Sequence, residues 1–271
     1  MSYTSAEMMT VAAARALGND DICFVGIGLP SAACNLARLT HAPSVTLIYE
    51  SGTLETRPAA LPLSIGDGEL CESALTTVPV PELFRYWLQG GRISVGFLGG
   101  AQVDRFGNLN STVIGEYAHP KVRLPGSGGA SEISTGCGQI FIVMPQNPRS
   151  FVAQLDFLTT LGHGRTGRER RELGIRTKGP TLLVTDLCIM RPEPESNEMV
   201  VTSMHPGVTR AQIRESTGWD VRFAPAADET APPAPGELEV LRALHARTAE
   251  ITAGAARESA ARWRSSVAPA R

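Results

Sequence analysis

Residues 21–52 read DICFVGIGLPSAACNLARLTHAPSVTLIYESG, and this stretch decides the fold. It holds a short apolar run, Asp21–Val25, and a glycine turn. A helical segment then opens at Pro30 and continues to about Leu39, and a second apolar run follows at Val45–Tyr49. A strand–glycine–helix–strand order is typical of a βαβ unit, whose strands lie parallel in one sheet. The sequence therefore predicts an α/β domain with a parallel sheet.

Glu50 stands directly after the second apolar run and is followed by Ser51 and Gly52. In open α/β sheets, ligands collect beyond the carboxyl ends of the strands. A carboxylate on a tight glycine turn at that edge is placed to meet a substrate. A solvated glutamate at the start of a loop is the simpler alternative, and the motif by itself leaves both interpretations open.

Similar patterns predict elements on either side of this unit. Thr4 and Glu7 have the spacing of a capping box, which opens a helix that Gly18 can end. Thr209 and Gln212 repeat that spacing before a helix closed by Gly218. Further strands are predicted at residues 92–98, 139–144, 181–188 and 199–204, and further helices at 81–88, 149–155 and 236–251.

Two segments look irregular. Residues 162–179 are rich in Gly and Arg and predict an exposed loop, and residues 224–235 are rich in Ala and Pro and predict a linker. We therefore expect one domain over residues 1–225. Residues 226–271 would hold the linker, a C-terminal helix and a frayed tail. The helix has an apolar stripe that either packs on the core or forms an arm on a partner; it comprises Leu238, Leu241, Leu244 and Ile251.

Composition narrows the function. The chain has 271 residues, 42% hydrophobic and 19% charged, with a net charge of −2, so no basic field for nucleic acid is expected. Five scattered cysteines argue against a zinc site or disulfide framework and for a reducing compartment. The N-terminus lacks the pattern of a signal peptide, and no apolar run approaches the ~18 residues of a membrane helix. These features predict a cytoplasmic protein.

Glycine-rich segments are the other candidates for chemistry. Gly26 and Gly28 form a G-x-G without the third glycine of a dinucleotide fingerprint, so by itself it is weak evidence. In the loop that begins at Gly99 and Gly100, glycines leave backbone N–H groups open to a ligand. Uncharged side chains on this loop could stabilise negative charge on an acyl oxygen, or could instead cap their own backbone; they are Gln102, Asn108 and Asn110.

The remaining motifs exclude several mechanisms. Residues 123–130, with Gly128 and Gly129, could form a phosphate nest but lack the G-K-[ST] of a P-loop. There is no G-x-S-x-G elbow and no H-E-x-x-H, and the five histidines are spread along the chain. Glu50 and Glu55 are close in sequence, but this does not fix the carboxylate separation that a glycosidase needs.

Taken together, these stretches resemble the B subunit of family I CoA-transferases. Tyr49–Gly52 is similar to the family's catalytic glutamate motif, and Gly99–Asn108 to its G-A-x-Q-V-D-x-x-G-N loop. Further similar motifs lie at residues 61–67, 119–130, 185–190 and 203–209, and the similarity spans roughly residues 5–225. Relatives commonly have glycine shortly after the glutamate motif, where this chain has Glu55.

The resemblance implies a CoA-transferase (NagB/RpiA-like) fold, an open and mostly parallel sheet flanked by helices. It implies that Glu50 is a nucleophile that forms a glutamyl-CoA thioester, and that the Gly99 amide stabilises the oxyanion. It points to residues that would bind substrate or CoA: Gly26, Gly28, Gly100, Gln102, Asn108, Gly128 and Gly129.

The same resemblance implies no metal and no cofactor, because the coenzyme A thioester is a substrate. It implies a separate A subunit, an α2β2 heterotetramer and a position of Glu50 near the subunit interface. Dicarboxylates are the expected acceptors. A CoA-thioester hydrolase and a non-catalytic partner subunit remain as alternatives.

Overall fold

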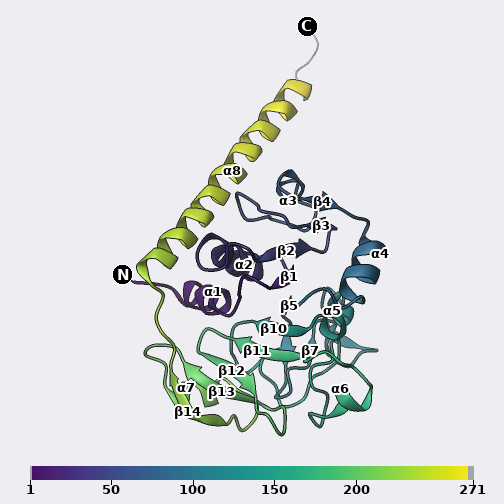
Figure 1. Ribbon diagram of the computed structural model, residues 1–271, viewed down its shortest axis with the longest axis vertical. Coiled ribbons are helices and arrows are strands. Elements are labelled where there is room, and N and C mark those ends of the chain that lie inside the picture. Colours follow the sequence, from purple (N-terminus) through teal and green to yellow (C-terminus); the bar gives the residue numbers. More distant parts are fainter. Residues whose placement is uncertain (1, 268–271) are drawn as a thin grey trace.

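A computed structural model describes residues 2–267 and is centred on a ten-stranded sheet (Figure 1). The strand order is β14-β13-β12-β11-β10-β5-β1-β2-β3-β4. In chain order these strands are β1 (Ile22–Val25), β2 (Thr46–Tyr49), β3 (Thr53–Leu54), β4 (Thr76–Thr77), β5 (Val95–Leu98), β10 (Gln139–Val143), β11 (Pro180–Val184), β12 (Cys188–Pro192), β13 (Met199–Met204) and β14 (Phe223–Glu229).

Two small two-stranded sheets and nine helical segments complete the described fold. The small sheets pair β6 (Gln102–Val103) with β7 (Leu109–Asn110) and β8 (Val113–Gly115) with β9 (Pro120–Arg123). The helical segments are α1 (Ser5–Arg15), α2 (Leu29–Leu39), α3 (Glu69–Glu72), α4 (Val80–Glu82), the π-helix η1 (Leu83–Leu88), α5 (Ala130–Gly136), α6 (Glu169–Glu172), α7 (Arg210–Glu215) and α8 (Pro235–Val267).

The centre of the sheet is parallel. β2, β1, β5, β10 and β11 run in one direction, while β3 and β4 at one side and β12 and β13 at the other join as antiparallel neighbours. The α/β class with a mostly parallel sheet, expected from the βαβ pattern, is confirmed. The sheet order also places β1 between β2 and β5. After β2, β3 and β4 the chain therefore crosses to the other side of β1 and forms β5 there.

Both faces of the central strands are buried, which explains their almost continuous apolar sequences. Along β1, the side chains of Cys23 and Val25 point to one hydrophobic cluster and Phe24 points to the other. The first cluster is completed by α1 and α2, and the second by η1 and α5. On the second face, Gly96 allows α5 to pack closely, because a Cβ there would lie only 2.7 Å from Cys137 Sγ.

Local capping chemistry determined two helix starts as predicted. The Thr4 hydroxyl accepts a hydrogen bond from Glu7 N while the Glu7 carboxylate accepts one from Thr4 N, and Thr209 and Gln212 make the same reciprocal pair. The helix expected at 81–88 is present, but only its first turn, α4, is α-helical. Its remainder is the wider η1, and π-helical turns frequently occur at functional sites.

One predicted helix is absent and one predicted strand is shorter than expected, because side chains close turns at both places. Residues 149–155 are not helical. Instead, Asn147 Oδ1 accepts hydrogen bonds from the N–H groups of Arg149 and Ser150. The strand predicted at 181–188 stops at Val184, because Thr185 Oγ1 accepts from the N–H groups of Leu187 and Cys188 and turns the chain into β12.

The two segments expected to be irregular contain more structure than predicted. Residues 223–229 form β14, a sheet-edge strand parallel to β13, so the expected boundary at residue 225 falls inside a strand. Residues 162–179 include α6 and are not simply an exposed loop, because Arg170 is only 5% exposed.

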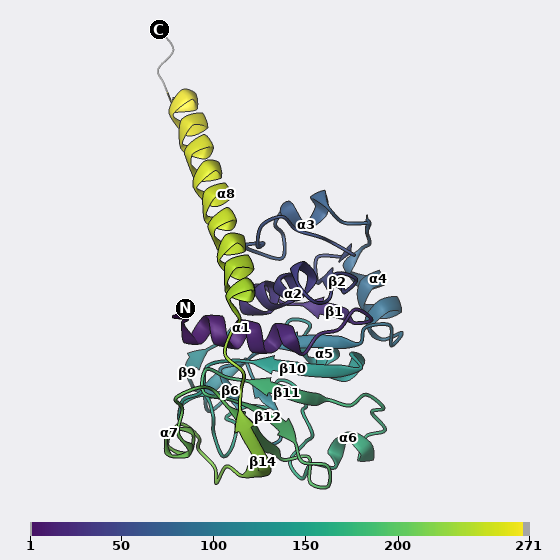
Figure 2. The ribbon, with the colours of Figure 1, turned by 60° about the vertical axis from the view of Figure 1, so that its left-hand side comes forward.

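α8 starts on the body of the protein and then projects away from it (Figures 1 and 2). Leu238, Leu241 and Leu244 are buried, as the apolar stripe predicted, whereas Ile251 is exposed. The helix continues to Val267, through most of the expected frayed tail. Residues 268–271 lie outside the described part. Within residues 2–267, no helix is both long enough and apolar enough to cross a bilayer.

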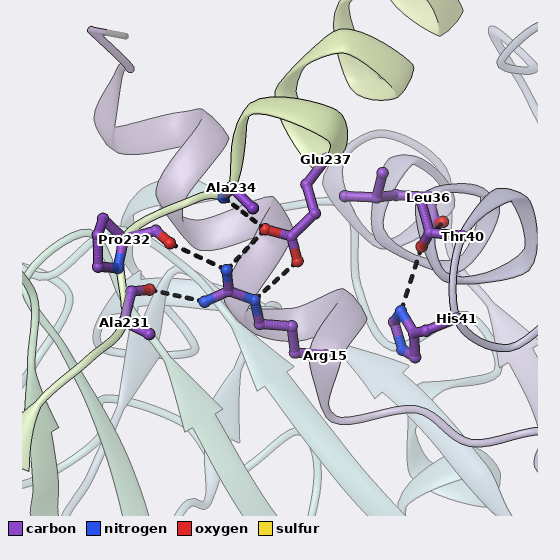
Figure 3. Close-up of polar contacts among 8 residues, drawn as sticks. All are labelled: Arg15, Leu36, Thr40, His41, Ala231, Pro232, Ala234 and Glu237. Atoms are coloured by element: carbon purple, nitrogen blue, oxygen red, sulfur yellow. Dashed lines mark hydrogen bonds and ion pairs between the residues drawn. The ribbon is translucent and has the colours of Figure 1, made fainter.

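An ion pair fixes the start of α8 (Figure 3). The Arg15 guanidinium at the end of α1 lies 2.6 Å from Glu237 Oε2 and also donates to the carbonyl oxygens of Ala231 and Pro232. Glu237 Oε2 accepts a further hydrogen bond from Ala234 N. The chain that leaves the sheet edge is therefore tied to α1 where α8 begins.

Candidate active site

Three neighbouring strands end at one edge of the sheet, and each is followed by a residue that the sequence singled out. Gly26 follows β1, Glu50 follows β2 and Gly99 follows β5. After β1 the chain adds β2 on one side of it, and later adds β5 on the other side. This edge of the sheet is therefore a topological switch point, where open α/β sheets bind their ligands.

A pocket of about 500 Å³ lies at this edge and brings five of the nine candidate site residues together. These are Gly26, Glu50, Gly99, Gly128 and Gly129. Apart from the Glu50 carboxylate, the lining side chains are mostly apolar. They include Phe24, Ile65, Phe97, Leu98, Ile133 and Val143. An apolar pocket with a single carboxylate suits a reaction in which that carboxylate is the reactive group.

The turn that carries Glu50 is fixed from both sides. Gly52 N donates to Tyr49 O, and Gly52 has a φ of 99°, a conformation that favours glycine. A Cβ at Gly52 would lie 2.0 Å from Val78 O, so the chain before α4 passes directly against this turn. On the other side, the buried Tyr49 hydroxyl is hydrogen-bonded to Ser31 of α2. Glu50 therefore sits on a rigid support.

The Glu50 carboxylate itself is half-buried and is not engaged by the protein. Within the part of the chain that the structure describes, no group donates a hydrogen bond to it and no cation lies within ion-pair distance. Both of its oxygen atoms are therefore available to a ligand in the pocket.

Gly129 comes closest to this carboxylate. A Cβ built on Gly129 would lie 2.7 Å from Glu50 Oε1 and 2.6 Å from Phe84 Cζ. Phe84 belongs to η1 and packs edge-to-face against Phe24, with 5.8 Å between the ring centroids. A side chain at residue 129 would therefore have to displace Glu50 or Phe84.

Gly99 and Gly100 bring the chain after β5 close to other backbone atoms. A Cβ at Gly99 would lie 3.3 Å from Val143 O, and one at Gly100 would lie 3.0 Å from Asn110 O. Gly99 lines the pocket, whereas Gly100 is not among its lining residues. The role of the Gly99 amide as an oxyanion donor remains a prediction.

The structure does not bring Gln102 and Asn108 to the pocket. Both are buried and their amides are used within the protein. Gln102 Oε1 accepts from Asn110 Nδ2 and Gln102 Nε2 donates to Asp156, while Asn108 bonds to Asp104 and to the backbone of Gly162 and Gly164. These side chains hold loops together, the alternative that the sequence left open.

Gly28 also lies elsewhere. It is the residue before α2, with a φ of 82°, and it lines a separate hollow between α1, α2 and α8. Glu55, the departure from the family pattern, is outside the pocket too. Its carboxylate pairs with Arg57 Nη2 at 3.2 Å. Glu55 thus adds no second acid to the lining of the Glu50 pocket.

Sequence reasoning missed the residues that shape the pocket walls. Ile65 lies in the motif at residues 61–67, but nothing in that motif indicates that Ile65 lines a pocket. Ser127 also lines the pocket and directly precedes Gly128, which was a candidate. Phe84 gave no signal at all, because an aromatic residue in a helical segment is usually core. Its role depends on contacts with residues 60 and 45 positions away, Phe24 and Gly129.

Comparisons with known proteins agree with this geometry. The sequence profile of the coenzyme A transferase family matches residues 6–216. The chain belongs to that family, and it is a CoA-transferase.

Several relatives are named as B or beta subunits of CoA-transferases. The chain is 62% identical, over 92% of its length and 95% of the relative's, to the B subunit of the 3-oxoadipate CoA-transferase of Pseudomonas knackmussii. It is 35% identical to the B subunit of the glutaconate CoA-transferase of Acidaminococcus fermentans, over 89% and 92% of the two chains. The crystal structure of that organism's glutaconate CoA-transferase aligns with a TM-score of 0.83 at 32% identity, covering 89% of this chain and 94% of the other. The resemblance to family I B subunits is thereby confirmed.

Proposed function

We propose that the chain is the catalytic B subunit of a CoA-transferase that moves CoA from succinyl-CoA to 3-oxoadipate, in the breakdown of aromatic compounds. The choice of acceptor follows the name of the relative with 62% identity. The observation that carries the catalytic proposal is Glu50, a carboxylate in a mostly apolar pocket that has no hydrogen-bond or ion-pair partner among the described residues.

The proposed chemistry proceeds through covalent catalysis at Glu50. The carboxylate attacks the thioester carbonyl of succinyl-CoA, the carbon–sulfur bond breaks, and a mixed anhydride and CoA thiolate form. The thiolate attacks the glutamyl carbonyl of the anhydride, succinate leaves, and a glutamyl-CoA thioester remains. The 3-oxoadipate carboxylate then repeats these steps in reverse, which releases 3-oxoadipyl-CoA and restores Glu50.

The residues around Glu50 suit this sequence of steps. A carboxylate is ionised near neutral pH, so the nucleophile needs neither a general base nor a metal, and the CoA thioester is a substrate. Each tetrahedral stage places negative charge on the former carbonyl oxygen, and we assign the Gly99 amide as its donor. The tight approach of Gly129 restricts the rotamers of Glu50 and so orients it toward the pocket.

The proposal includes a separate A subunit in a cytoplasmic α2β2 heterotetramer. Support comes from the exposed apolar side chains near the pocket. Ile65 lines the pocket and is 43% exposed, and Leu63, two residues before it, is 62% exposed. Exposed apolar side chains that gather in one region are typical of protein–protein interfaces. An A subunit placed there would close the pocket and contribute to the CoA site.

Turnover by a Glu50→Gln variant of the assembled enzyme tests the proposal, with Glu55→Gln as the matched control. Both changes remove one carboxylate from the same segment, but only Glu50 lines the pocket. We expect Glu50→Gln to abolish CoA transfer and Glu55→Gln to retain it. Full activity of Glu50→Gln would point to a non-catalytic subunit. CoA release that is independent of 3-oxoadipate would point to a hydrolase.

A further inference from the structure

The arginine-rich segment has a place of its own in the fold. Between residues 165 and 178 the sequence has six basic and two acidic side chains, although the whole chain has a net charge of −2. Part of this segment lines a pocket of about 750 Å³. The basic residues that line it are Arg168, Arg170, Arg171, Arg176 and Lys178.

This basic pocket lies at the opposite end of the parallel strands from Glu50. Lys178 N donates to Gly138 O, and these two residues shortly precede β11 and β10. Glu50, by contrast, follows β2, and the central strands run in one direction. In both views of the ribbon, α6 lies well apart from β2 (Figures 1 and 2). The basic pocket is therefore distinct from the proposed active site.

Arg170 forms the buried floor of the pocket. Its guanidinium donates only to neutral acceptors, namely the carbonyl oxygens of Leu161, Gly162 and Ser134 and the Thr177 hydroxyl. Its Nε is buried and, among the described residues, has no partner. Burial of this uncompensated charge lowers the pKa of Arg170 to about 10. A buried charge is costly unless an opposite charge comes near, and here the described protein supplies none.

The other four cations of the pocket are exposed and also lack ion-pair partners among the described side chains. Neither of the two acids in this segment, Glu169 and Glu172, lines the pocket, and the Glu169 carboxylate accepts a hydrogen bond from Arg165 N. Glu195 is the single acid among the lining residues. Five cations thus converge on one hollow with one carboxylate, an arrangement that raises the local concentration of anions.

We propose that this basic pocket binds a small polyanion that carries two or more phosphate or carboxylate groups. Guanidinium groups match both anions because they can donate two parallel hydrogen bonds to either. The bound anion would supply the counter-charge that Arg170 lacks. A concave pocket with a buried floor fits a small molecule better than a flat macromolecular surface. The proposal does not depend on the acceptor acid of the transferase reaction.

Calorimetric titration of the assembled enzyme with inorganic pyrophosphate, and separately with citrate, tests this proposal at constant ionic strength. The test variant is Arg168→Gln/Arg176→Gln. The control, Arg149→Gln/Arg247→Gln, removes the same charge from two exposed arginines outside the basic pocket. Comparison of the two probes distinguishes a phosphate from a carboxylate ligand.

We expect saturable binding of at least one probe, unchanged by the control substitutions and by saturating CoA. The pocket variant should bind about tenfold more weakly or worse, since losing a hydrogen bond to a charged group typically costs about a factor of ten. Absence of saturable binding to the unmodified enzyme would overturn the proposal, as would equal weakening in the control. Displacement of the probe by CoA would overturn it too, because the anion would then occupy the CoA site.

Discussion

The backbone of Gly129 lies directly against the carboxylate of Glu50, so that a Cβ added to Gly129 would stand 2.7 Å from Glu50 Oε1. The glycine comes from the loop before α5 and the glutamate from the end of β2. Their contact limits where the carboxylate can point. It also explains why two motifs far apart in the sequence belong to one site.

Gly129→Ala should therefore impair catalysis while leaving the fold intact. The new methyl group must displace Glu50 or Phe84, and a displacement of about 1 Å from a reactive geometry can cost roughly 100-fold in rate. We expect a loss of kcat of that order, measured as CoA transfer by the assembled enzyme. Gly68→Ala is the control, because Gly68 has an ordinary φ of −59° and a Cβ added there would have no atom within 4 Å. Equal activity of both variants would contradict the positioning role of Gly129.

Glu55→Gly should stabilise the protein. Glu55 has a φ of 50°, a left-handed conformation that costs a residue with a side chain about 1–2 kcal/mol. Glycine avoids this cost but loses about 0.5–1 kcal/mol through its greater freedom in the unfolded chain. We expect a net gain of about 0.5–1 kcal/mol in the free energy of unfolding.

Glu55→Ala separates the backbone effect from the lost carboxylate, since alanine removes the same exposed ion pair with Arg57 but keeps the Cβ. Urea unfolding should place Glu55→Gly above Glu55→Ala, with CoA transfer retained in both. If the two variants unfold alike, the left-handed backbone at residue 55 does not strain the folded protein.

Acidification should destabilise the protein through two buried histidines. Burial lowers the pKa values of His163 and His205 below the ordinary value of 6.5. The unfolded chain therefore binds protons at a higher pH than the folded protein does, and stability is lost as pH falls below about 6.5. The imidazole of His205 bonds to Thr185 O and Thr230 Oγ1, and so joins the turn after β11 to the chain after β14.

Urea unfolding between pH 7.5 and 5.5 measures this effect above the ordinary pKa range of exposed carboxyl groups. A His205→Gln variant should lose part of the pH dependence, and His163→Gln/His205→Gln should lose more. A pH slope that is unchanged in the double variant would show that other groups cause the destabilisation.

Arg15→Gln should loosen the start of α8. Arg15 contacts Glu237, Ala231 and Pro232 (Figure 3), and hydrogen bonds that involve charged groups contribute roughly 1.5–3 kcal/mol. We expect a loss of about 2 kcal/mol in the free energy of unfolding and faster amide hydrogen exchange at residues 231–245. Arg247→Gln, which changes an exposed arginine on the same helix, should alter neither quantity. Equal exchange in both variants would contradict the anchoring role of Arg15.

The parts of the fold that sequence predicted well depend on local chemistry. Thr4 with Glu7 and Thr209 with Gln212 form capping boxes within four residues, so their helix starts are readable from the chain. β14 was missed because an Ala- and Pro-rich edge strand is defined by its pairing with β13 rather than by its own residues. The burial of Arg170 was missed because a charged residue usually indicates exposure. In the structure its guanidinium is buried and donates to the carbonyl oxygens of Leu161 and Ser134.

The candidate site shows the same difference between features set by local sequence and features set by tertiary packing. Glu50, Gly26 and Gly99 could each be placed at the end of a strand from the sequence, and the structure brings them together because the ends of these parallel strands meet at one sheet edge. Gln102 and Asn108 were expected near a ligand, but their partners, Asp156 and Asp104 among them, are set by loop packing that no spacing rule gives. Phe84 reaches the site only through tertiary contacts.

Trapping of the covalent intermediate tests the nucleophilic role of Glu50 most directly. The assembled enzyme is incubated with succinyl-CoA, treated with borohydride, which reduces a glutamyl thioester to an alcohol, and digested for mass spectrometry. We predict a reduced side chain at Glu50, dependent on succinyl-CoA, present in Glu55→Gln and absent from Glu50→Gln. Recovery of an unmodified Glu50 peptide from enzyme that transfers CoA at its full rate, or a reduced glutamate at another position, would contradict the proposed mechanism.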